Sequence, residues 1–105
     1  MKEYVSIDIQ SNKDVATVIG LCNQLLPDYS WKSGDSDAQG PYLSGKNKDS
    51  VKIKIWLGEA PYEMSISFQN SWLQSQDKED KMKNVVSNIT NNVIPNFGQV
   101  TSIDT

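Results

Sequence analysis

The segment VKIKIWLGEAPYEMSISF, residues 51–68, constrains the fold most strongly because apolar and polar side chains alternate along both of its halves. Alternation with a period of two places successive side chains on opposite faces of a β-strand. The residues GEAP at 58–61 separate the halves, so the segment predicts an antiparallel hairpin in which Trp56 faces Glu63. The apolar face of this hairpin consists of Val51, Ile53, Ile55, Leu57, Tyr62, Met64, Ile66 and Phe68.

Trp56 is the exception to the pattern, because it lies on the face that should be polar. Tryptophan and tyrosine are common anchors of protein interfaces. We therefore expect Trp56 to be exposed in the free domain and to be covered by a partner.

The other elements follow from the same two periodicities, with 3.6 residues per repeat for helices. Ser11 and Asp14 suit the start of the first helix, with Ser11 as its N-cap. In chain order, the predictions are a strand over 3–9, a helix over 11–27, a short strand over 29–34, a long loop over 35–50 with at most a brief strand at Tyr42 and Leu43, the hairpin, a helix over 76–98, and an optional edge strand over 99–103.

These elements predict one α+β domain covering residues 1–105. Their order is β-α-β-β-β-α, with the optional strand last. Strands that alternate are covered on one side only, so we expect a two-layer sandwich, a mostly antiparallel sheet with both helices on one face. The other face is left to solvent or to a partner.

Charge and missing residue types narrow the functional classes. The chain has thirteen acids, ten lysines, no arginine and no histidine, and its net charge is −3. An acidic chain without arginine is unlike a nucleic-acid-binding protein. The lack of histidine removes the commonest general base and metal ligand. We expect no enzyme, no cofactor and no metal site.

The compartment is predicted from the single cysteine and from hydropathy. Cys22 has no partner for an internal disulfide and lies on the apolar stripe of the first helix, where it is expected to act as a small hydrophobe. The longest apolar runs are too short to cross a membrane. These features predict a cytoplasmic protein without membrane contact.

Two local patterns suggest ligands. The segment DSDAQG at 35–40 begins like a calcium-binding loop, but Lys46 stands where the loop requires its bidentate glutamate. A basic run of Lys46, Lys48, Lys52 and Lys54 beside Trp56 could form a stacking platform for single-stranded nucleic acid. A solvated acidic loop and a solubilising strand face are the preferred interpretations.

The remaining acidic and aromatic residues outside the helices suit a basic protein partner, since opposite charges speed the encounter and aromatic side chains hold the complex. The candidate partner-binding residues are Asp35, Asp37, Tyr42, Trp56, Glu59, Glu63 and Trp72.

In size, in acidity and in the stretches DYSWKSGDSDAQG and SFQNSWLQSQDKEDK, the chain resembles the small immunity proteins of bacterial contact-dependent growth inhibition. The resemblance implies a cytosolic protein that binds a cognate toxin, often a nuclease, and occludes its active site. An RNA-cleaving toxin is the first expectation. The alternatives are an accessory subunit that oligomerises through its open sheet face, a single-strand-binding module, and an enzyme that uses carboxylates alone.

Overall fold

The computed structural model describes residues 4–38, 40–59, 61–68 and 75–104, with side chains from 79 onward in the last range. It is an α+β structure with a six-stranded antiparallel sheet and two α-helices. The elements are β1 (Tyr4–Gln10), α1 (Val15–Leu25), β2 (Ser30–Ser36), β3 (Gly40–Lys46), β4 (Val51–Trp56), β5 (Tyr62–Phe68), α2 (Ser75–Asn88) and β6 (Gln99–Asp104).

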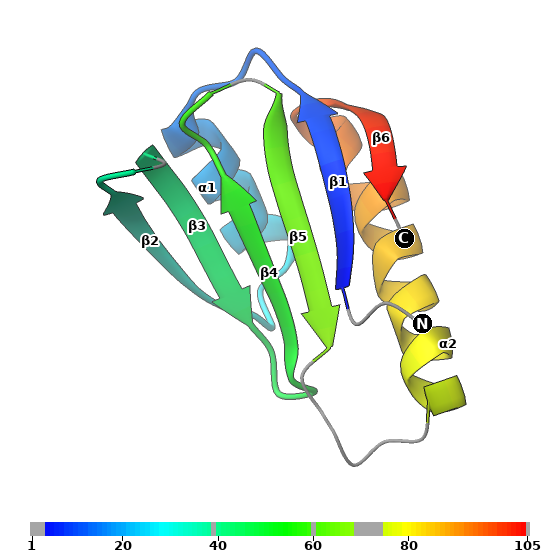
Figure 1. Cartoon of the computed structure of the whole chain (residues 1–105). Coiled ribbons are helices and arrows are strands. Elements are labelled where there is room, and N and C mark those ends of the chain that lie inside the picture. Colours follow the sequence, from blue (N-terminus) through cyan, green and yellow to red (C-terminus); the bar gives the residue numbers. More distant parts are fainter. Residues whose placement is uncertain (1–3, 39, 60, 69–74, 105) are drawn as a thin grey trace.

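The strand order across the sheet is β2-β3-β4-β5-β1-β6, and every neighbouring pair is antiparallel. The first strand therefore lies inside the sheet, between β5 and the last strand (Figure 1). The connection after β4 and the end of β1 lie at the top of this view, and the turn after β2 lies at its upper left. We call this end the upper end of the sheet.

The central hairpin has the predicted register. Trp56 pairs with Glu63, and the pairs of the other face include Ile53 with Ile66. All eight residues predicted for the apolar face are buried. They join Val5, Ile7 and Ile9 of β1 in one core, as alternation requires when one side of the sheet is covered.

The predicted loop over 35–50 is wrong, because most of it forms the hairpin of β2 and β3. Each strand has a glycine directly opposite an aromatic residue: Gly34 pairs with Tyr42, and Gly45 with Trp31. A β-carbon on either glycine would lie 2.5 Å from the opposing ring. Each ring thus occupies the space next to the glycine of the facing strand, which compensates for the weak strand propensity of glycine. The element order accordingly contains one strand more than predicted before α2, and the optional last strand is present as β6.

In Figure 1, α1 lies behind the sheet, and α2 lies at the edge formed by β1 and β6, partly behind β6. From α1, the core receives Val18 and Cys22, and the chain beyond α2 supplies Ile89, Val93 and Ile94. Neither helix in the described part of the chain has the length and apolar character needed to cross a bilayer.

The ends of the helices differ from the predictions. Asp14, not Ser11, caps α1, since its carboxylate accepts a hydrogen bond of 2.8 Å from the backbone N–H of Thr17. The Ser11 hydroxyl instead donates to the backbone carbonyl of Phe97. The predicted helix over 76–98 remains α-helical only to residue 88, and a π-turn and a 3₁₀-turn containing Pro95 complete it.

Candidate partner-binding surface

The sheet has an outer face, opposite to the core, which is formed by the alternate residues of each strand. The register aligns these residues in three rows that cross the strands. From the upper end downward they are Gly34, Tyr42, Trp56, Glu63, Asp8 and Ser102; then Lys32, Ser44, Lys54, Ser65, Ser6 and Asp104; then Ser30, Lys46, Lys52, Ser67 and Tyr4.

The uppermost row places two aromatic side chains beside two carboxylates. Tyr42 pairs with Trp56, Trp56 with Glu63, and Glu63 with Asp8. Side chains directly opposite on neighbouring strands have β-carbons about 5 Å apart. The row therefore changes from aromatic to anionic between β4 and β5.

The aromatic pair is closely packed. The ring centroids of Tyr42 and Trp56 are 5.4 Å apart with an interplanar angle of 59°. The ammonium nitrogen of Lys54 lies 4.3 Å from the Trp56 centroid and 4.7 Å from that of Tyr42. Cation–π contacts of this kind stabilise exposed sites by about 0.5–1 kcal/mol.

Trp56 lies on the outer face, as strand parity predicts, but it is partly buried rather than fully exposed. The side chains of Tyr42 and Lys54 cover part of its indole. The tryptophan is thus held in place in the free protein, and an interface there would lose little side-chain entropy when it forms.

An open depression of about 540 Å³ lies beside the indole at the upper end of the sheet. Trp56 forms its aromatic side, and Glu59 and Glu63 contribute two carboxylates. Its lining consists of Ala38, Gly40, Pro41, Trp56, Gly58, Glu59, Pro61 and Glu63. The two hairpin connections supply half of these residues and three different strands supply the rest, which is why the sequence does not reveal the depression.

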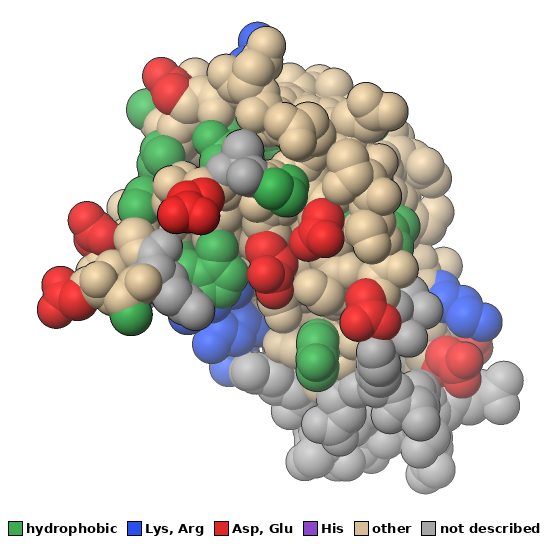
Figure 2. Space-filling view, turned by 45° about the horizontal axis from the view of Figure 1, so that its top comes forward, with side chains coloured by type: hydrophobic (Ala, Val, Ile, Leu, Met, Phe, Trp, Pro, Cys, Tyr) green, Lys and Arg blue, Asp and Glu red, His purple; other side chains and the backbone are tan. Residues whose placement is uncertain are grey.

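Further carboxylates lie near this depression. Asp35 and Asp37, both exposed, lie at the end of β2 and in the turn beyond it, next to residues that line the depression. Figure 2 shows acidic side chains distributed over this end of the molecule, close to hydrophobic ones. We call Asp8, Asp35, Asp37, Glu59 and Glu63 the acidic rim.

The two faces of the sheet divide the acidic rim. Asp35 pairs with Pro41, one position beyond the pair of Gly34 and Tyr42, so strand parity assigns Asp35 to the face opposite the aromatic pair. Glu63 and Asp8 belong to the outer face itself. Asp37 and Glu59 lie in the connections between strands.

Of the other predicted residues, Trp72 lies outside the described residues. Asp8 was not among the candidate partner-binding residues, although the alternation of β1 assigns it to the outer face that Glu63 also occupies. The missing information was that β1 pairs with β5, which places Asp8 directly opposite Glu63.

The lower part of the outer face is basic. Lys46 pairs directly with Lys52, and Lys32 and Lys54 belong to the row above. None of these four lysines forms an ion pair with another described residue; the ion pair found among the described residues is an exposed one of 3.9 Å between Lys83 and Glu79. The outer face is therefore divided between carboxylates at its upper end on β5 and β1 and lysines on β2, β3 and β4.

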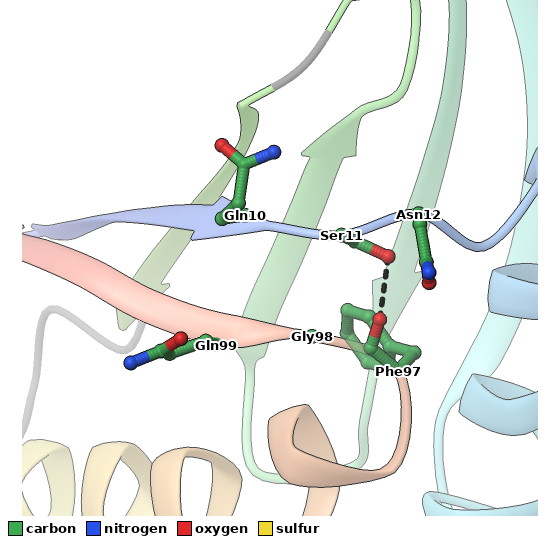
Figure 3. Close-up of a pocket in the computed structure, with 6 residues that line it drawn as sticks. All are labelled: Gln10, Ser11, Asn12, Phe97, Gly98 and Gln99. Atoms are coloured by element: carbon green, nitrogen blue, oxygen red, sulfur yellow. Dashed lines mark hydrogen bonds between the residues drawn. The ribbon is translucent and has the colours of Figure 1, made fainter.

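A second hollow, of about 330 Å³, lies between the end of β1 and the start of β6 (Figure 3). It is lined by Gln10, Ser11, Asn12, Phe97, Gly98 and Gln99, none of which has an ionisable side chain. A β-carbon on Gly98 would lie 2.6 Å from the backbone oxygen of Gln10. The residues here join two chain segments closely and offer no acid or base for catalysis.

The ionisable groups inside the fold are also poor candidates for chemistry. Burial raises the pKa of the Cys22 thiol to about 12, so the nucleophilic thiolate is not populated at neutral pH. Burial, and then the charges of Asp49 and Asp28, raise the pKa of Tyr29. Within the described ranges, the structure brings together no three Cys, Asp or Glu side chains able to hold a metal ion.

Neither the family models nor the curated proteins with which the chain was compared match it.

Proposed function

We propose that this protein is a cytosolic immunity protein that binds a cognate bacterial toxin domain and blocks its active site. In this proposal the chain is a two-layer sandwich that presents its outer face and acidic rim to the toxin. The observation that supports it best is the depression beside Trp56, which has the indole on one side and is lined by the carboxylates of Glu59 and Glu63.

The chemistry of this surface suits a basic nuclease. A nuclease attracts phosphate with lysine and arginine side chains, and carboxylates at the rim can bind those cations in place of the substrate. An RNA-cleaving toxin is the first candidate. The packed pair of Tyr42 and Trp56 suits the centre of such an interface, since buried tryptophan and tyrosine carry much of the binding energy.

The test is protection of growing cells. The proposal requires a toxin domain encoded beside this chain. Cells that produce that toxin domain are expected to survive when this protein is also produced, and to die when they produce an unrelated toxin domain instead. Trp56→Ala should weaken the complex by about 2 kcal/mol or more, roughly thirtyfold, if the indole is at the centre of the interface. Asp35→Lys should reduce the association rate, most strongly at low salt.

Lys83→Ala serves as the matched control, because this residue is exposed on α2, a helix that packs against the core and not against the outer face. It should leave protection and affinity unchanged. Failure to protect against the neighbouring toxin would contradict the proposal. Full affinity in the double variant of Trp56→Ala and Asp35→Lys would contradict the position of the site.

A second candidate function is single-strand binding, which the contact of Lys54 with both rings and the lysines below them favour. Bases stack on aromatic rings, and lysines neutralise phosphates. Glu63 and Asp8 beside the rings oppose it, because they repel phosphate. Titration of a labelled single strand at low salt distinguishes the candidates: salt-sensitive binding that Trp56→Ala abolishes would support this function.

A further inference from the structure

We propose that the outer face is self-complementary in charge and that two copies of this chain associate through it. This inference uses the division of charge on the face and does not depend on the identity of any other partner. It makes the free protein a weak, salt-sensitive homodimer whose interface includes Trp56.

The first argument is that the face contains two like-charged pairs. Asp8 lies directly opposite Glu63, and Lys46 lies directly opposite Lys52. Like charges in opposite positions on neighbouring strands destabilise a sheet. Each pair would become favourable if charges of the other sign covered it, and this protein contains both signs on one surface.

The second argument is geometric. The acid pair lies on β5 and β1 in the top row, and the lysine pair lies on β3 and β4 in the bottom row, four residues or about 13 Å away along the strands. Let the outer faces of two copies face each other, with a two-fold axis midway between the sheets and parallel to them. The axis is perpendicular to the line that joins the acid pair to the lysine pair. That axis places each acid pair on the lysine pair of the other copy, as an isologous interface requires.

The third argument is area. Six strands about 4.8 Å apart and about seven residues long give a face of about 600 Å², so two copies bury about 1,200 Å² together, the lower limit for specific complexes. Serines occupy much of this face, including Ser6, Ser44, Ser65 and Ser67. A small polar interface of this size should be held largely by its charges, and salt should weaken it.

The test measures the oligomeric state by sedimentation equilibrium over a range of salt concentrations. Two double variants reverse one pair each: Lys46→Glu with Lys52→Glu, and Asp8→Lys with Glu63→Lys. Each alone should be monomeric, with a dissociation constant raised at least about tenfold. Mixing the two should restore a dimer, now containing one copy of each.

A matched variant, Lys13→Glu with Lys83→Glu, changes net charge as much as the first variant but lies off the face. It should dimerise like the wild type. Its affinity for the variant with Asp8→Lys and Glu63→Lys should be lower than the affinity of the variant with Lys46→Glu and Lys52→Glu for that same protein. Unfolding curves check that each variant is folded.

Three results would overturn the proposal. They are a monomeric wild type at high protein concentration and low salt, a dimer that neither reversal weakens, and a mixture of the two reversed variants that stays monomeric. None of these results bears on toxin binding, which the protection assay measures separately.

Discussion

The opposition of Asp8 and Glu63 makes a quantitative prediction about the monomer, which is measured at a protein concentration too low for self-association. The two carboxylates are direct neighbours across β1 and β5, and Glu63 also accepts a hydrogen bond of 3.4 Å from Ser6. At a separation of about 6 Å in water, two unit charges repel by about 0.7 kcal/mol. Cross-strand pairs in sheets have effects of about 0.2–1 kcal/mol, which agrees.

The perturbation is a double-mutant cycle with Asp8→Asn, Glu63→Gln and the combined variant. Both changes remove charge and keep the shape, and the amide introduced by Glu63→Gln retains an oxygen that can accept from Ser6. Each single variant should raise the free energy of unfolding by about 0.2–0.7 kcal/mol, and the combined variant should gain little more, because either change already removes the repulsion. The gain should fall at 0.5 M salt, where the screening length is about 4 Å.

Urea unfolding followed by tryptophan fluorescence and by circular dichroism measures these differences. Asp80→Asn, an exposed acid on α2, is the control for a general effect of net charge. The reasoning is refuted if the coupling energy is zero at low salt, or if it does not change with salt. Asp8→Asn and Glu63→Gln should also weaken the binding of a basic partner. These substitutions should therefore raise the free energy of unfolding and lower the affinity for the partner.

The other predictions concern the scaffold. Gly45→Ala should destabilise the protein by about 1–3 kcal/mol, because its β-carbon would press on the Trp31 ring, and urea unfolding would detect this. Cys22 should resist a thiol reagent until the protein unfolds. Because the pKa of the Cys22 thiol is raised to about 12 in the folded state, its contribution to stability should be complete below pH 9 and should disappear as the pH rises toward 12. Hydrogen bonds from Thr17 lower the pKa of Asp14, so its contribution is present above its ordinary pKa of 3.8 and is lost as the pH falls through the lowered value. Asp14→Ala should lower the melting temperature at pH 7 and remove that part of the acid dependence, as thermal unfolding at several pH values would show.

The charge pattern of the outer face has a consequence for the proposed partner. A uniformly basic surface laid across the whole face would meet Lys46 and Lys52 as well as the carboxylates. A basic toxin would therefore dock toward the upper end, over the acidic rim and the depression. If self-association also occurs, it covers Trp56 and Glu63, and toxin and second copy would compete for them.

The central hairpin and its core could be predicted because one strong period of two runs through both strands. Ile53, Ile55, Met64 and Ile66 had to share one face, and a one-residue slip of either strand would have moved its apolar residues to the other face. The outward position of Trp56 followed from the same parity. Its partial burial did not, because it depends on Tyr42, whose strand was assigned to a loop.

The sequence by itself determined the features that depend on local periodicity. These are the amphipathic helices, the alternating strands and the side of the sheet on which each residue lies. Pairings between distant segments were decided only by the tertiary structure. Gly34 and Gly45 weaken the strand pattern of the edge hairpin in the sequence, and only the folded structure shows the aromatic rings that pack on them. Asp8 lies opposite Glu63 only because β1 pairs with β5. The physical reason is that hydrogen-bonded ladders can join any two compatible strands, so burial across the whole chain, not local pattern, selects the neighbours.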